Sequence, residues 1–162
     1  KTMYCILMKI SICCICKTDE KYLIEGIDKY LLRLKHYCKI DFETFKDIKP
    51  GSTPDETTKR EAELVFSKLK SDDVLILLDE HGEMYDSVKF ARYIEKLQVN
   101  AHKNVIFLIG GAFGHHKTVR ARADHQVSLS KMTFSHQMVR LFLTEQIYRA
   151  FTILRNEKYH NE

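Results

Sequence analysis

The stretch VLILLDEHG, residues 74–82, decides the fold. Its first five residues are all apolar, with no polar alternation, which is typical of a strand buried on both faces of a parallel sheet. A second run of this kind, residues 105–109, leads directly into the glycine-rich segment GGAFG, residues 110–114. Two such strands predict a sheet that is covered by helices on both faces.

Helix and strand patterns alternate on either side of these two runs. We expect strands at residues 9–16, 38–45, 74–78, 105–109 and 127–130, and helices at residues 23–34, 62–69, 88–97, 118–122 and 136–154. Thr18 or Asp19 is the expected cap of the first helix, and Ser87 that of the third. Residues 46–58 hold both prolines and are expected to form one long loop. The alternation predicts an α/β three-layer fold with a mainly parallel sheet.

Length and composition fit one domain. The chain has 162 residues, of which 44% are hydrophobic and 30% are charged, and these values exclude disordered and low-complexity classes. No repeat or linker divides the chain, so we expect residues 8–162 to form a single domain and residues 1–7 to be an N-terminal extension. A formal charge of +4 permits an anionic partner but does not demand one.

The cysteines and the N-terminal apolar run favour the cytoplasm. The five cysteines are an odd number, and we interpret them as small apolar strand residues in a reducing compartment. The apolar run at residues 3–16 is interrupted by Lys9 and is too short to span a membrane. Charged residues follow it in place of a cleavage pattern. We therefore expect a cytoplasmic protein without a membrane partner.

Three segments that follow predicted strands are the candidates for chemistry, namely residues 78–82, 109–114 and 129–134. In open α/β sheets, ligands bind beyond the carboxyl ends of the strands. The dinucleotide fingerprint G-x-G-x-x-G, the phosphate-binding G-x-x-x-x-G-K-[ST] and the nucleophile motif G-x-S-x-G are all absent. Their absence argues against a dinucleotide-dependent oxidoreductase.

Metal binding is not expected, and RNA binding stays open at this stage. Four histidines lie between residues 115 and 136: His115, His116, His125 and His136. Their spacing is not that of a metal site. Basic residues between 117 and 158 are interleaved with Phe134 and Tyr159, a mixture that can hold phosphates and stack bases. Charge alone leaves a solvated helix face equally open.

Several motifs together resemble one family. They are LDE at 78–80, IGGAFG at 109–114, LSKMTFSHQMVR at 129–140, EQIYRAF at 145–151 and YH at 159–160. They resemble the bacterial ribosomal large-subunit RNA methyltransferase H family, which is of the SPOUT class. The segments MKI at 8–10 and KTDEKY at 17–22 extend the resemblance, which covers about residues 8–160.

The resemblance implies a SPOUT-type three-layer α/β/α fold with a deep C-terminal trefoil knot, an exception to the usual topology rules. The family transfers a methyl group from S-adenosyl-L-methionine to N3 of a pseudouridine in the helix 69 loop of 23S rRNA. It acts as a cytoplasmic homodimer on the assembled ribosome, with a composite site at the subunit interface. Two alternatives remain, an RNA-binding module of this fold without methyl transfer and a SPOUT methyltransferase of another RNA.

The motifs also imply roles for individual residues. The cofactor-binding positions are Leu78, Gly110, Leu129, Ser130, Lys131, Met132, Thr133 and Phe134. The expected catalytic residues are His136, Tyr159 and His160, and the expected substrate-binding residues are Arg140 and Arg155. The alternative for His136 is that it caps the long helix. The chain departs from the family pattern at Cys16, His81 and His115, which leaves the fine shape of the pocket open.

Removal of the chain from Tyr159 onward tests the role of the C-terminal tail. We expect the truncated protein to bind the cofactor, because the predicted cofactor positions all precede the tail, and to lose methyl transfer. Calorimetry and a methyl-transfer assay measure the two properties separately. Full activity of the truncated protein would remove the tail from the site.

Overall fold

A five-stranded sheet, in which every strand pair is parallel, organises the molecule. The computed structural model describes residues 8–46 and 48–161, so the expected extension at residues 1–7 lies outside the described residues. The strands are β1 (Lys9–Ile15), β2 (Lys39–Phe45), β3 (Val74–Met84), β4 (Asn104–Ile109) and β5 (His125–Ser128). The helices are α1 (Lys21–Leu34), α2 (Pro54–Lys68), α3 (Ser87–Val99), α4 (Lys117–Arg122) and α5 (Met138–Leu154).

The apolar runs lie in the middle of the sheet, as predicted. The strand order is β2-β1-β4-β3-β5, and residues 75–77 of β3 have no exposed surface. The outer strand β2 alternates exposed and partly buried residues, because the face with Ile40 and Phe42 packs against the core and the other face is more open. The α/β prediction with a mainly parallel sheet is therefore confirmed.

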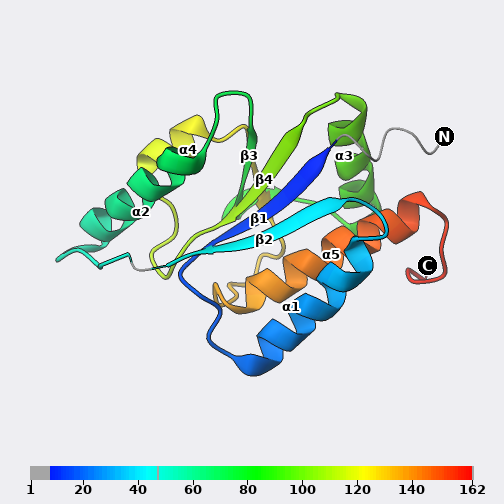
Figure 1. The fold of residues 1–162 in the computed structure, drawn as a ribbon, viewed down its shortest axis with the longest axis horizontal. Coiled ribbons are helices and arrows are strands. Elements are labelled where there is room, and N and C mark those ends of the chain that lie inside the picture. The colour runs from blue at the N-terminus through cyan, green and yellow to red at the C-terminus, as the bar shows by residue number, and fades with distance from the viewer. Residues whose placement is uncertain (1–7, 47, 162) are drawn as a thin grey trace.

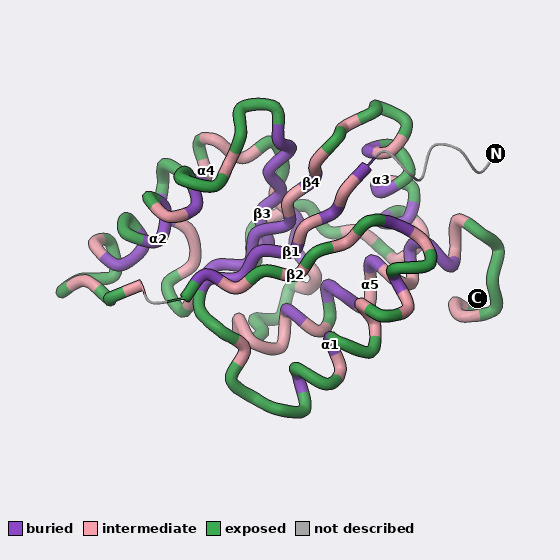
Figure 2. Tube along the Cα trace, in the orientation of Figure 1, coloured by how far each residue is buried: buried purple, intermediate pink, exposed green. Residues whose placement is uncertain are grey.

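Helices cover both faces of the sheet and make three layers (Figure 1). One apolar core joins the sheet to α1, α3 and α5 through residues such as Leu34, Phe90 and Leu143. A smaller core on the opposite face joins the sheet to α2 and α4 through Val65 and Val119. Figure 2 shows this arrangement as buried residues along the strands and exposed residues on the outer sides of the helices.

The register of the strands places four carboxyl ends at the same level. Ile109 of β4 is paired with Cys14 of β1 on one side and with Leu78 of β3 on the other. Leu78 is in turn paired with Val127 of β5. The segments that follow these strands therefore leave the sheet side by side at one edge.

Several boundaries and caps differ from the predictions. Helix α2 begins at Pro54, because Thr53 accepts a hydrogen bond from the backbone N–H of Glu56, and the expected loop at 46–58 is shorter. Strand β5 begins and ends two residues earlier than expected, at His125 and Ser128. Asp86, and not Ser87, caps α3 by accepting from the N–H of Lys89.

The predicted cap of α1 is also wrong, and the alternative role of His136 as the cap of α5 is not observed. The N-cap of α1 is Glu20, which makes no side-chain capping bond. At the start of α5, the hydroxyl of Ser135 accepts from the N–H of Met138 at 3.1 Å, so His136 is not the cap. Its imidazole is thereby left for another role.

Strand β3 continues beyond the predicted residues 74–78. Its pairing with β5 is irregular between Leu78 and Glu83. Gly82 lies in this irregular stretch directly against the backbone of β5, where a Cβ atom would be 2.6 Å from the nitrogen of Val127. Two segments far apart in sequence therefore pass each other without an intervening side chain. The knot implied by the resemblance stays a prediction.

The described cysteines are free thiols, and most are core residues. Cys13, Cys14 and Cys38 are buried, whereas Cys16 is exposed at the end of β1 with a φ of 65°. Burial raises the pKa of the Cys13 and Cys14 thiols to about 12, so both stay protonated and unreactive at neutral pH. In the part of the chain that the structure covers, no helix is both long and apolar enough to cross a membrane.

Replacement of Gly82 by Ala tests the close approach of β3 to β5. We expect the free energy of unfolding to fall by about 1–3 kcal/mol, because the new methyl group meets backbone atoms that cannot rotate away. The matched control is Gly26→Ala in α1, whose Cβ would meet only the side chain of Leu141. Thermal unfolding compares the two, and equal midpoints would contradict the packing described for Gly82.

Candidate active site

A cavity of about 530 Å³ opens at the edge where the strands end level. Its walls come from three segments: residues 78–81 after the regular part of β3, residues 109–115 after β4, and residues 127–136 at the end of β5 and beyond. These are the three segments that sequence analysis named as candidates for chemistry. The register of the sheet brings them together.

Most of the predicted site residues line this one cavity. They are Leu78, Gly110, Leu129, Ser130, Met132, Thr133, Phe134 and His136. Among the predicted cofactor positions, Lys131 does not line the cavity and is exposed. The apolar walls include Leu78, Ile109 and Leu129, and polar groups lie between them.

Short-range hydrogen bonds shape the segment after β5. The hydroxyl of Ser128 donates to the carbonyl oxygen of Ser130 at 2.8 Å, and the hydroxyl of Ser130 accepts from the N–H of Met132 at 2.9 Å. Thr133 donates to the carboxylate of Glu80 at 2.9 Å. Residues 128–133 are thus held by hydrogen bonds to one another and to the continuation of β3.

The glycine segment makes a tight turn on the opposite wall. The N–H of Gly114, which has a φ of 73°, donates to the carbonyl oxygen of Gly111 at 3.2 Å. A Cβ atom on Gly110 would lie only 2.9 Å from the carbonyl oxygen of Gly114. Glycine at 110 therefore lets the turn close, and glycine at 114 supplies a backbone conformation that other residues rarely adopt.

Three polar residues that we did not predict as site residues also line the cavity, namely Asp79, His115 and Arg120. Arg120 of α4 forms an ion pair with Asp79 at 2.5 Å, and its Nε donates to the carbonyl oxygen of His115 at 3.3 Å. Burial alone would raise the pKa of Asp79, but the hydrogen bond from the N–H of His81 and the ion pair with Arg120 outweigh it and lower the pKa. Asp79 is therefore ionised and holds α4 against the end of β3.

His115 is partly buried beside this ion pair. Its Nε2 is 3.0 Å from the carbonyl oxygen of Leu78, and a carbonyl oxygen only accepts, so Nε2 carries the proton. Burial lowers the pKa of His115, so the ring is neutral at pH 7. Each of the three had a signal in the sequence: Asp79 lies in the LDE motif, and His115 departs from the family pattern. Arg120 is one of the basic residues between 117 and 158, but nothing in the sequence predicted its ion pair with Asp79.

His136 lies on the cavity wall with part of its ring exposed. Burial lowers its pKa, and the charge of Arg140 lowers the pKa further, so the imidazole is neutral at pH 7. A neutral imidazole can accept a proton from a ligand in the cavity. His136 is the one predicted catalytic residue that the structure brings to the predicted cofactor positions.

Arg140 has no exposed surface, and this corrects the expectation that it binds substrate. Its guanidinium donates to the carbonyl oxygen of Ile15 at 2.7 Å and to that of Cys16 at 3.0 Å. It also donates to the hydroxyl of Thr18 at 3.0 Å and to the carbonyl oxygen of His136 at 3.2 Å. The side chain joins α5 to the end of β1, and four of its five N–H groups are bonded within the protein.

The C-terminal tail folds back on α5 and α1. The hydroxyl of Tyr159 donates to Glu145 at 3.0 Å, and the guanidinium of Arg149 lies 4.7 Å from the centre of the Tyr159 ring. Arg149 also donates to Nδ1 of His160 at 3.1 Å and pairs with Glu145. Tyr159 does not line the cavity described above, nor a second cavity that lies between α3 and α5.

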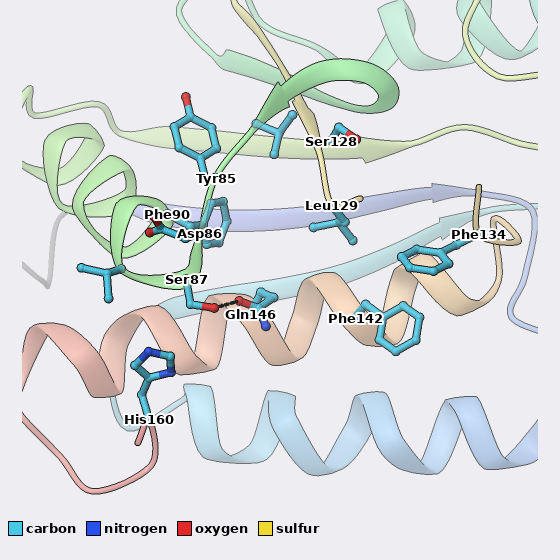
Figure 3. Close-up of a pocket in the computed structure, with 12 residues that line it drawn as sticks. Tyr85, Asp86, Ser87, Phe90, Ser128, Leu129, Phe134, Phe142, Gln146 and His160 are labelled. Atoms are coloured by element: carbon cyan, nitrogen blue, oxygen red, sulfur yellow. Dashed lines mark hydrogen bonds between the residues drawn. The ribbon is translucent and has the colours of Figure 1, made fainter. Parts of the chain in front are cut away.

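His160 lines a neighbouring cavity of about 560 Å³ between α3 and α5 (Figure 3). Both cavities are lined by Ser128, Leu129 and Phe134, so one chain segment forms a wall of each. Arg155, the other predicted substrate-binding residue, is exposed at the end of α5, with its guanidinium 4.3 Å from the centre of the Tyr37 ring. It lines neither cavity.

Comparison with known proteins identifies the family. Residues 8–160 match a family model described as a predicted SPOUT methyltransferase. A protein of Christiangramia forsetii named ribosomal RNA large subunit methyltransferase H is 49% identical, with 95% of this chain and 99% of the relative covered. Proteins of the same name from Flavobacterium johnsoniae and Bacteroides fragilis are 48% and 43% identical, with 96% of this chain and 100% of each relative covered.

A solved structure supports the fold. It is described as a probable methylase family protein from Haemophilus influenzae, and it aligns with a TM-score of 0.54 over 96% of this chain and 72% of that chain. The identity is 12%, so this similarity concerns the fold alone. Together with the family match over residues 8–160, these findings show that the chain belongs to the SPOUT methyltransferase family and resembles, over nearly its whole length, the members named ribosomal RNA large subunit methyltransferase H.

Proposed function

We propose that this protein methylates 23S rRNA of the large ribosomal subunit, at N3 of a pseudouridine in the helix 69 loop, with S-adenosyl-L-methionine as the methyl donor. The observation that carries the proposal is the shared cavity. Segments from three strands, predicted from motifs to bind the cofactor, meet around one space, and only Lys131 among the predicted positions lies outside it. The names of the relatives support rRNA as the substrate.

The cavity fits the chemistry of this cofactor. An adenine ring needs apolar walls and nearby backbone donors and acceptors. Leu78, Ile109 and Leu129 supply such walls. Gly110 and Gly114 of the tight turn also line the cavity, and because they have no side chains, their backbone groups are accessible to a ligand. When bound, S-adenosyl-L-methionine supplies a methyl group that is already activated by the sulfonium. No group of three or more potential metal ligands occurs in the described part of the chain.

The protein must hold the base and receive its proton. His136 is neutral and borders the cofactor cavity, so we assign it as the group that accepts the proton from N3. Tyr159 cannot serve as this base, because its hydroxyl is donated to Glu145 and its pKa is raised by burial and by the hydrogen bonds with Tyr30 and Glu145. Tyr159 and Arg149 instead place His160 beside the neighbouring cavity, which we assign to the substrate.

A homodimer is part of the proposal. Phe134 and Phe142 pack at a centroid distance of 5.1 Å, and more than a third of each side chain is exposed beside the two cavities. Exposed apolar surface at the mouth of a site favours coverage by a second subunit. In a composite site of this kind, the exposed Arg155 contacts RNA that is bound across the interface. We further propose that the protein acts in the cytoplasm on the assembled ribosome.

Transfer of a labelled methyl group to ribosomes tests the function. The substrate is assembled ribosomes that lack this modification, and nuclease mapping locates the label. We expect the label on N3 of the pseudouridine in the helix 69 loop. Label on another nucleotide would contradict the proposed target, and cofactor binding without any transfer would favour an RNA-binding module. His136→Gln should retain cofactor binding and lose most of the transfer rate, whereas the exposed His36→Gln serves as the control.

Substitution of Gly110 tests the cofactor assignment. We expect Gly110→Arg to abolish binding of S-adenosyl-L-methionine, because the side chain would enter the turn and the cavity wall. Gly110→Ala should weaken binding by about tenfold, since its Cβ meets the carbonyl oxygen of Gly114. Isothermal titration calorimetry gives the dissociation constants. Unchanged affinity in the Arg variant would refute the assignment of the cavity.

A further inference from the structure

His115 connects the segments that form the cofactor cavity. It follows the tight turn at residues 110–114 and lies partly buried on the cavity wall. Its Nε2–H donates to the carbonyl oxygen of Leu78 at 3.0 Å. Leu78 is the last residue before the pairing of β3 with β5 becomes irregular. One side chain from the segment after β4 thus makes a direct bond to the end of the regular part of β3.

The same ring also packs against the glycine turn. Its Cε1 atom lies 3.2 Å from the position that a Cβ atom of Gly110 would occupy. The imidazole therefore contacts two of the positions expected to hold the cofactor, Leu78 through a hydrogen bond and Gly110 through packing. A shift of the ring would change the distance between the two walls.

A second set of bonds anchors the backbone of His115. Its carbonyl oxygen accepts from Nε of Arg120 at 3.3 Å, and Arg120 is paired with Asp79 at 2.5 Å. Asp79 is next in sequence to Leu78. The ring of His115, bonded to Leu78, and its backbone, connected to Asp79 through Arg120, are therefore both joined to the same part of β3. Arg120 and Asp79 thus hold the backbone of His115 beside β3, where its ring reaches the Leu78 carbonyl oxygen.

We propose that His115 is a positioning residue of the cofactor cavity, whose bond from Nε2–H to the Leu78 carbonyl oxygen holds the glycine turn and the end of β3 at the separation that the cofactor requires. This inference rests on the proposed function. It gives a physical meaning to a histidine at a position where the family pattern led us to expect a smaller or apolar residue. The neutral ring is the form that packs in this partly buried position without charge repulsion from Arg120.

Three substitutions separate the hydrogen bond from the volume of the ring. His115→Leu introduces an apolar side chain of similar size that has no N–H to donate to the Leu78 carbonyl oxygen. His115→Gln has an amide N–H that can reach the Leu78 carbonyl oxygen, and His115→Asn has the same group on a shorter side chain. His36→Leu is the matched control, because His36 is exposed at the end of α1, far along the chain from the cavity segments.

We expect the Leu and Asn variants to bind S-adenosyl-L-methionine about tenfold more weakly than the wild type, the scale of one lost hydrogen bond. The Gln variant should recover most of the affinity. KM for ribosomes should stay unchanged in all three variants, and KM for the cofactor should follow the dissociation constant. The thermal midpoint, measured beside calorimetry, shows that each variant is folded. A general loss of structure would raise both KM values and would not be rescued by Gln.

The outcomes distinguish this inference from the proposed function. Wild-type affinity in a folded Leu or Asn variant would overturn the role of His115 alone. Equal weakening in the Gln, Asn and Leu variants would also overturn it, because the hydrogen bond would then not be the cause. Failure of the wild-type protein to bind S-adenosyl-L-methionine would overturn the proposed function and this inference with it.

Discussion

The register of four parallel strands is the constraint on which the site depends. The pairing of Cys14, Ile109, Leu78 and Val127 across the sheet makes the carboxyl ends level. None of the three segments that line the cavity has enough polar or apolar groups to enclose a ligand alone. A shift of one pair by a residue would separate them and would also turn buried side chains to the opposite face. The hydrophobic runs that set this register therefore set the geometry of the site.

Several hydrogen bonds and an ion pair around the cavity join one of its segments to another. Thr133 with Glu80, Arg120 with Asp79, and the ring of His115 with Leu78 all connect the continuation of β3 to another wall. The end of β3 is thus the common partner of the other two segments. Its own position is determined by close backbone contact at Gly82. A cavity built in this way is largely formed before any ligand arrives, which reduces the entropic cost of binding.

The sheet, its central strands and most of the cavity segments could be predicted, because long apolar runs and glycine after a strand have few structural interpretations. The helix starts were less predictable. Thr18, Asp19 and Ser87 are all good capping residues by type, but the caps in the structure depend on where the chain enters each helix. The interpretation of Arg140 failed for a similar reason. From the sequence, an arginine near a predicted site was interpreted as a ligand-binding residue. Only the fold shows that Arg140 donates its hydrogen bonds to the carbonyl oxygens of Ile15 and Cys16 at the end of β1.

The bonds of Arg140 also constrain the order in which the chain can fold during its synthesis. Strand β1 is made early, yet the carbonyl oxygens of Ile15 and Cys16 receive their partner from a residue about 125 positions later. Strand β1 also needs β4 as its inner neighbour, so its pairing is complete only after two thirds of the chain has been made. Contacts of such long range delay folding. The nascent protein therefore reaches its final structure only when α5 has left the ribosome that makes it, and the cavity beside α5 is completed only then.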